Sequence, residues 1–361
     1  MQYGRLAAAT VRPIIDRLAA LPRWVGGVAA VGCAMAVRGV WMTPNIADWL
    51  AMAREPLGTP AVPPTNTYIM SSPLPAVTAG LLGFAHNEWT FATFHLIVLL
   101  GSLVLTMRAV SRRAPGAEWL LLAVFISAPI STVTFTWLGQ PDAYVVGLGA
   151  ALVFLRRPPA VLAVAALLAL TSFEQGVYVV ASVGLVAAPL LGARRWIHAP
   201  AAAAGLLIGR VLLTGYQTAF GIDQETSRWE WLSDHGIWQA IQSQLGWWPV
   251  TVVSMFSVTW IFVVWWFRTA VDIPLAGGVA VAFAAALVPM TLSYDHSRVF
   301  AIITWPMLVA MVVWAGEHDD PSGVRRVVRL VLPVGIIVPA VLVGTPQLYG
   351  VAWPEILWNR S

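Results

Sequence analysis

Residues 90–113 read TFATFHLIVLLGSLVLTMRAVSRR, an apolar run that ends in three arginines. A helix needs about 20 mostly apolar residues to cross the hydrocarbon core of a bilayer. Arginines at one end of such a run mark the cytoplasmic side, because short cytoplasmic loops of membrane proteins collect positive charge. The stretch therefore predicts a membrane-spanning helix with Arg108, Arg112 and Arg113 in the cytoplasm.

The composition of the whole chain favours a membrane protein. Of its 361 residues, 58% are hydrophobic and 11% are charged, and the mean hydropathy is +0.75. Soluble domains usually carry about 25% charged residues, so these values exclude a soluble enzyme, a disordered chain and a nucleic-acid-binding protein. Cys33 is the single cysteine, which excludes an intrachain disulfide and a cysteine metal site. We expect one integral-membrane domain over residues 1–361.

Further apolar runs predict a polytopic, all-α membrane protein with about 11 transmembrane helices. The runs cover residues 23–42, 90–108, 118–137, 142–155, 160–174, 177–192, 198–214, 249–267, 273–290, 299–315 and 327–345. If the N-terminus is cytoplasmic, every cluster of arginines falls on the cytoplasmic side, in agreement with the usual charge asymmetry of membrane proteins. We expect this topology in a bacterial inner membrane.

Two long segments lie on the outer side in this topology. Residues 43–89 form the first outer loop and residues 215–248 form the second. Residues 72–86 are apolar enough to be taken for a span, but counting them as one would move the later arginine clusters outside. We therefore expect a short helix there, lying along the outer membrane surface.

Polar residues gather at the outer ends of several predicted spans. They are Asp48 and Glu55 in the first outer loop, Gln140 and Asp142 in the next turn, Glu174 in the turn at 171–176, and Asp295, His296 and Arg298 in the last turn. An ionisable group near the hydrocarbon costs at least a few kcal/mol, which makes such residues functional candidates.

Two of these acids have competing interpretations. Asp48 precedes Trp49 and Leu50, whose apolar side chains would desolvate its carboxylate enough for it to act as a base; the alternative is a helix cap or a surface acid. Asp142 either caps a helix or has a functional role, because Pro141 before it suits the first turn of a helix.

Three arginines are candidates for binding a phosphate. Arg298 follows Asp295 by three positions, so its planar fork either clamps a phosphate at the membrane surface or only locks the loop through Asp295. Arg38 and Arg210 lie in apolar runs toward their outer ends. They either line the same anionic pocket or only extend to the lipid headgroups.

Motifs of soluble active sites are absent from the sequence. It contains no Gly-rich phosphate loop, no HExxH pair and no Gly-x-Ser-x-Gly turn. The six histidines show no ligand spacing within a helix, so a zinc site is not expected. We expect no cofactor, and a divalent metal is not indicated.

The order of these features resembles a known superfamily of membrane enzymes over most of the chain. The first span is followed by a long outer loop with an early acid, in Asn45-Ile46-Ala47-Asp48-Trp49, and then by Thr67-Tyr68-Ile69-Met70-Ser71-Ser72-Pro73-Leu74-Pro75. Polar turns follow at Gly139–Asp142, Ser172–Gly176 and Asp295–Arg298. This layout is similar to the GT-C superfamily of integral-membrane glycosyltransferases, which use polyprenyl-phosphate-linked sugars.

The resemblance implies a base in the first outer loop. In the family, an acid at this place deprotonates the acceptor, and Asp48 alone matches its position. Members often carry a second acid beside it; here Trp49 follows, and Glu55 is the nearest later acid. The Trp-Trp-Asp signature of oligosaccharyltransferases is missing, because Pro249 follows Trp247-Trp248, so N-glycan transfer is not expected.

The expected function is therefore an inverting glycosyltransferase with an extracytoplasmic active site. Its partners would be membrane lipids, a polyprenyl-phosphate-linked sugar donor and a glycan, lipid or protein acceptor. The donor phosphate would be held by Arg298, with Arg210 or Arg38 assisting. The sugar and the acceptor would be positioned by Glu174, Gln140, Asp142, Glu55, Asp295 and His296.

Two other functions stay open at the level of the sequence. A secondary transporter usually places polar residues near the membrane midplane and contains paired repeats, whereas the charges here gather at the outer ends of the spans. A membrane polysaccharide polymerase or acyltransferase is the other alternative.

Overall fold

The computed structural model describes residues 23–59, 62, 69–192, 195–222, 238, 241–242, 248–270, 272–293, 295–338, 340, 342–343 and 348–349. Most of the predicted second outer loop at 215–248, including its acids and most of its tryptophans, lies outside these ranges. Within them the chain is all-helical apart from one antiparallel pair of two-residue strands, β1 (Leu342–Val343) and β2 (Leu348–Tyr349).

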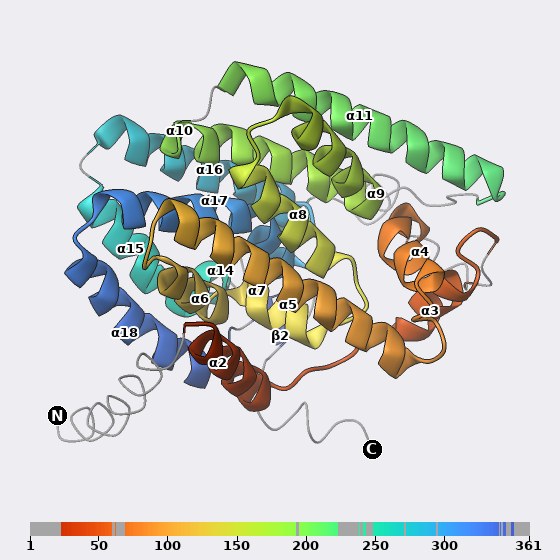
Figure 1. Ribbon diagram of the computed structural model, residues 1–361, viewed down its shortest axis with the longest axis horizontal. Helices are drawn as coiled ribbons and strands as arrows, with labels where there is room; N and C mark the ends of the chain where they lie inside the picture. Colours follow the sequence, from red (N-terminus) through yellow and green to blue (C-terminus); the bar gives the residue numbers. More distant parts are fainter. Residues whose placement is uncertain are drawn as a thin grey trace.

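The helices form one bundle, which Figure 1 shows with α17 passing through its middle. In chain order they are α2 (Arg23–Arg38), α3 (Ile46–Arg54), α4 (Pro73–Leu81), α5 (Glu88–Arg113), α6 (Glu118–Ser127), α7 (Pro129–Thr136), α8 (Asp142–Phe154), α9 (Pro158–Ser182), α10 (Ala188–Leu190), α11 (Arg195–Ala219), α14 (Trp248–Phe256), α15 (Trp260–Thr269), α16 (Ile273–Thr291), α17 (His296–His318) and α18 (Pro321–Ile337). A π-helical turn (Val183–Ala187) extends α9, and a 3₁₀ turn (Ser257–Thr259) joins α14 to α15.

Six helical segments in the described part of the chain are long and apolar enough to cross a membrane, or seven if the bent pair α6 and α7 is one span. By length and composition alone, the six are α5, α9 with its extension, α11 from His198, α14 with α15, α16 and α17; of these, α9 is interrupted at Ser172. Helices α2 and α8 are apolar but shorter. These helices support a multi-pass membrane protein. The predicted number of about 11 transmembrane helices stays a prediction.

Helix α17 is the centre of the hydrophobic core. Every residue from Phe300 to Ala315 is buried, as expected for a helix that is apolar on all sides and surrounded by other helices. Trp305 of α17 packs edge-on against Phe125 of α6, with ring centroids 5.5 Å apart. The apolar run at 299–315 predicted this helix, which begins three residues earlier than expected.

Prolines explain two departures from the predicted spans. The run at 118–137 is broken into α6 and α7, which meet at 66°, because Ala128 before Pro129 takes an extended conformation (ψ 155°). The prediction of one span over 327–345 is wrong, since α18 ends at Ile337. Val338 precedes Pro339 and is again extended (ψ 104°).

Helix α9 reverses direction at Ser172. This residue has non-helical dihedral angles (φ −168°, ψ 105°). A Cβ atom placed on Gly176 would lie 3.4 Å from the backbone carbonyl carbon of Leu168, whereas residues eight apart in a straight helix are roughly 12 Å apart. The polar turn predicted at 171–176 is therefore present as a fold-back within α9, and we call residues 172–176 the Ser172 turn.

Small residues hold α11 against the first half of α9. A Cβ atom on Gly209 would lie 2.5 Å from the carbonyl oxygen of Ala166, and a side chain on Gly205 would collide with the carbonyl oxygen of Leu162. Glycines four positions apart allow this close approach of helix backbones in membranes. This Gly-x-x-x-Gly motif is visible in the sequence but was not among the predicted features.

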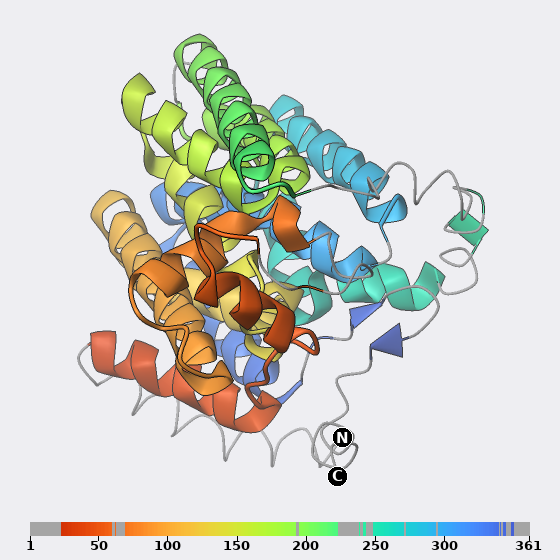
Figure 2. The same cartoon turned by 90° about the vertical axis from the view of Figure 1, so that its right-hand side faces the viewer.

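Helices α3 and α4 form a cap at one end of the bundle, at the right-hand edge of Figure 1 and facing the viewer in Figure 2. Helix α4 is the short helix predicted within residues 72–86. Helix α3 buries Ile46, Trp49, Leu50 and Ala53, which share one helical face, in a hydrophobic cluster separate from the main core. This cap positions the residues of the first outer loop.

Candidate functional site

Arg298 lies between two carboxylates. Its Nε and Nη2 donate hydrogen bonds of 2.8 and 3.0 Å to the two oxygens of Asp142, and its Nη1 donates one of 2.9 Å to Asp295. The guanidinium also lies over the ring of Trp137, 5.0 Å from its centroid. We call Arg298, Asp142 and Asp295 the Arg298 group.

Burial differs across the Arg298 group. The side chain of Asp142 is 1% exposed, that of Arg298 is 15% exposed and that of Asp295 is 31% exposed. A carboxylate as buried as Asp142 needs a paired charge, and the two-pronged contact supplies it. Asp295 is therefore the member that a ligand reaches most easily.

The Arg298 group sits where three elements end. Asp142 opens α8 after Pro141, Asp295 precedes α17, and Trp137 ends α7. Pro141 holds the N-cap position of α8, and the described hydrogen bonds of the Asp142 carboxylate go to Arg298, so Asp142 is not the cap residue. Asp295 holds the N-cap position of α17 without a side-chain capping hydrogen bond. Both acids nevertheless lie at helix N-termini, where the helix dipole favours negative charge.

The first outer loop joins the turn that precedes Asp142. The backbone N–H of Thr43 donates to the carbonyl oxygen of Leu138, and the backbone N–H of Leu138 donates to the carbonyl oxygen of Trp41. Gln140 Nε2 donates to Thr43 Oγ1 at 2.8 Å, and Thr43 Oγ1 donates to Asn45 Oδ1 at 2.7 Å. A chain of polar contacts thus runs from the start of α3 to the turn at 138–142.

Asp48 lies in the first turn of α3 and is partly exposed. Asn45 holds the N-cap position, so Asp48 is not the cap residue. Trp49 and Leu50, which follow it in the sequence, are buried at 3% and 4% exposure in the cluster that α3 covers. Glu55 follows the end of α3 and is exposed.

Arg210 of α11 contacts the Ser172 turn, to which Glu174 belongs. The guanidinium of Arg210 lies over the ring of Phe173, 5.2 Å from its centroid, and Glu174 is the next residue of the turn. Arg210 has no ion-pair partner among the residues that the structure describes. Its neighbours Leu207 and Val211 on α11 are exposed, which places Arg210 near the surface that lipid would cover.

Two predicted site residues point into the bundle. Arg38 is buried and donates hydrogen bonds to Ser131, to Thr132 and to the carbonyl oxygen of Gly335. It therefore does not extend to lipid headgroups, and no described contact links it to the Arg298 group. His296 is also buried, and its Nδ1 hydrogen-bonds to the carbonyl oxygen of Met290 at 3.0 Å.

The structure thus brings together some of the predicted site residues. Gln140, Asp142, Asp295 and Arg298 lie at neighbouring helix ends, and Arg210 contacts Phe173, the neighbour of Glu174 in the Ser172 turn. Sequence reasoning missed Trp137, Phe173 and Thr43, which contact these residues. The position of the first two next to polar turns was the available signal.

A resident metal has no evident place within the described ranges. No three His, Cys, Asp or Glu side chains there come close enough together to hold a metal ion. The arrangement instead offers carboxylates and arginines, which bind hydroxyl groups and phosphates.

Comparison of the chain with protein-family models, with curated proteins and with solved structures finds no match.

Proposed function

We propose that this chain is an integral-membrane glycosyltransferase with a GT-C-like layout of about 11 spans. In this proposal it moves a sugar from a polyprenyl-phosphate donor to an acceptor hydroxyl at the outer face of a bacterial inner membrane. The observation that carries the proposal is the Arg298 group, because a buried carboxylate, an arginine and an accessible carboxylate meet at one end of an apolar bundle. The first outer loop is joined to the same turn through Gln140 and Thr43.

The charge of the Arg298 group favours sugar hydroxyls over phosphate. With both carboxylates ionised, its formal charge is one negative unit, which repels a phosphate. Three of the five N–H donors of Arg298 are engaged by Asp142 and Asp295, so two remain for hydroxyl oxygens. The partly exposed Asp295 accepts from sugar hydroxyls. Arg298 then acts by holding both carboxylates, a different role from the phosphate clamp expected from the sequence.

The donor phosphate is assigned to Arg210. Its guanidinium is not ion-paired in the described part of the chain, and it lies on a helix whose neighbouring side chains are exposed. A polyprenyl-phosphate donor approaches from the lipid, so its phosphate meets Arg210 at the membrane boundary. Glu174, next to Phe173, is assigned a hydroxyl of the sugar.

Asp48 is the proposed base. Its carboxylate accepts the proton of the acceptor hydroxyl while that oxygen attacks the anomeric carbon. The bond between the anomeric carbon and the phosphate oxygen breaks, and the electron pair leaves with polyprenyl phosphate. Attack from the side opposite the phosphate inverts the anomeric centre. Arg210 stabilises the charge that grows on the departing phosphate, an effect often worth about 3 kcal/mol per donor group.

The experiment that tests this function follows the lipid product. Purified protein in detergent is given undecaprenyl-phosphate-linked sugars, labelled in the sugar, together with membrane glycan and lipid extracts as acceptors. Transfer of the label with release of undecaprenyl phosphate supports the proposal. Failure of every labelled sugar to leave the lipid, with folded protein confirmed by its melting curve, contradicts it.

A secondary transporter is the second candidate, and the broken helices favour it. The 66° bend between α6 and α7 and the fold-back of α9 at Ser172 resemble the discontinuous helices of many transporters. The test is uptake of a labelled sugar or sugar phosphate into sealed proteoliposomes. Uptake without turnover of lipid-linked sugar in detergent would favour the transporter over the enzyme.

A further inference from the structure

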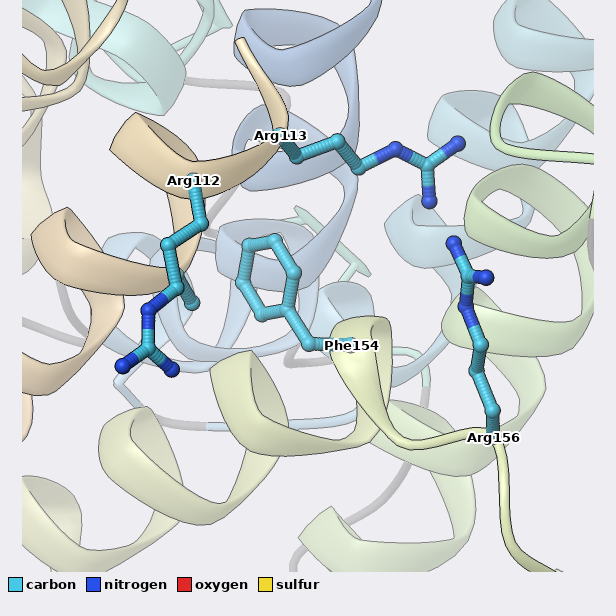
Figure 3. Close-up of a pocket in the computed structure, with 5 residues that line it drawn as sticks. Arg112, Arg113, Phe154 and Arg156 are labelled. Carbon is cyan, nitrogen blue, oxygen red and sulfur yellow. The ribbon is translucent and has the colours of Figure 1, made fainter. Parts of the chain in front are cut away.

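A basic pocket lies at the end of the bundle opposite the first-loop cap. It has a volume of about 380 Å³ and is lined by Ala109, Arg112, Arg113, Phe154 and Arg156, which we call the arginine pocket. Arg112 and Arg113 end α5, Phe154 ends α8, and Arg156 follows in the connection to α9. Figure 3 shows the side chains of Arg113 and Arg156 extending toward each other, with the ring of Phe154 between Arg112 and Arg113.

The arginine pocket carries more positive charge than its acids neutralise. Arg113 pairs with Glu317 at 2.6 Å and donates to the carbonyl oxygen of Leu191 at 2.7 Å. Arg112 and Arg156 have no hydrogen-bond or ion-pair partner among the described residues. Guanidinium groups that approach one another repel unless an anion lies between them, and their planar donors suit phosphate oxygens.

An apolar strip of α5 leads to the arginine pocket. Gly101, Leu105, Ala109 and Arg112 follow one another at spacings of three or four residues and so share a face of α5. Leu105 is 67% exposed and Gly101 is also exposed, so lipid chains can lie along this strip. A molecule with an acyl chain on the strip would bring its headgroup to the arginines.

We propose that the arginine pocket binds the phosphate headgroup of an anionic membrane lipid. The arginines contact the phosphate oxygens, and Ala109, Leu105 and the ring of Phe154 contact the glycerol and the upper acyl chain. Basic pockets between membrane helices bind anionic lipids in this way. The exposed apolar strip favours a lipid over free phosphate, which would need only the arginines. The site lies apart from the Arg298 group and does not depend on the proposed function.

The test compares lipid binding by two double variants that remove the same charge. Arg112→Ala with Arg156→Ala removes the two unpaired arginines of the pocket. Arg325→Ala with Arg326→Ala removes two exposed arginines of α18, which do not line it. Binding of dioleoyl phosphatidylglycerol to each protein in detergent is titrated by native mass spectrometry, with dioleoyl phosphatidylcholine and inorganic phosphate as the other probes.

We expect wild type and the α18 variant to bind phosphatidylglycerol equally, and the pocket variant to bind it roughly 10- to 30-fold more weakly. Phosphatidylcholine should show no difference between the proteins. Equal phosphatidylglycerol binding by all three proteins would overturn the site. If inorganic phosphate competes with the lipid at millimolar concentration and raises the melting temperature as much as the lipid does, the pocket holds free phosphate and the lipid assignment is wrong.

Discussion

Arg298 and Asp142 lie 156 positions apart in the sequence and form two parallel hydrogen bonds, of 2.8 and 3.0 Å. Through this contact the first turn of α17 is fixed to the first turn of α8. Because Asp142 is almost fully buried, Arg298 also supplies the paired charge that its carboxylate needs away from water. The same contact leaves Asp295 as the accessible carboxylate.

Removal of the buried partner should therefore destabilise the protein. Asp142→Ala leaves Arg298 with Asp295 alone, and loss of one member of a buried pair typically costs about 3–5 kcal/mol. Asp295→Ala removes a partly exposed carboxylate and should cost about 1 kcal/mol or less. Melting curves of the two purified variants measure the difference. A smaller loss for Asp142→Ala than for Asp295→Ala would show that the Arg298–Asp142 pair does not hold the helix ends together.

Arg298→Lys keeps the charge but not the geometry. A lysine ammonium cannot reach both carboxylates with the planar arrangement of arginine, so we expect a loss of about 1–2 kcal/mol in stability and at least a tenfold loss in turnover. Melting and sugar transfer are measured on the same preparation. A lysine variant that matches wild type in both would show that a point charge at this position suffices.

The close contact of α11 with α9 can be tested with one methyl group. Gly205→Ala places a Cβ atom against the carbonyl oxygen of Leu162, so the helices must separate, at a cost of about 1–3 kcal/mol. Gly215→Ala on the same helix is the matched control, because nothing lies within 4 Å of its Cβ position. The melting temperature should fall for the first variant only. Equal melting temperatures would mean that the two helices do not pack at Gly205.

Most helices could be predicted from the sequence because their apolar runs are long. Residues 90–108 and 299–315 predicted α5 and α17, since a bilayer or a surrounding bundle demands such runs. The apolar run at 327–345 did not predict the end of α18 at Ile337, because that end depends on Pro339, which disfavours a helical conformation of the residue before it.

Long-range pairing explains what could not be predicted at the site. Helical spacing identified Asp295 as a partner of Arg298, but Asp142 belongs to another helix and no local pattern indicates the contact. For Arg38 the sequence left open an anionic pocket or the lipid headgroups, because its partner Ser131 comes from α7 and no local pattern indicates the contact. Only the folded arrangement of helices shows that Arg38 is buried. It also shows that Arg210 has no ion pair among the described residues.

Arg210→Ala should weaken use of the lipid donor without affecting the fold. Loss of charge-assisted contacts to the phosphate should raise the apparent KM for the undecaprenyl-phosphate-linked sugar about tenfold or more. The melting temperature should hardly change, because neighbouring side chains on α11 are exposed. Val211→Ala, which shortens an adjacent exposed side chain, is the control. An unchanged KM for the alanine variant of Arg210 would remove it from the donor site.

The most direct measurement is sugar transfer by Asp48→Asn, with melting recorded on the same purified protein. The change keeps the shape of the side chain but removes the carboxylate that accepts the proton. If Asp48 is the base, turnover of the lipid-linked sugar should fall about 10²–10⁴-fold, while the melting temperature stays within about one degree of wild type. Glu88→Gln, which neutralises an exposed acid of the same loop that has no assigned role, should keep most of the activity. Near-normal transfer by Asp48→Asn would contradict the account and exclude Asp48 as the base.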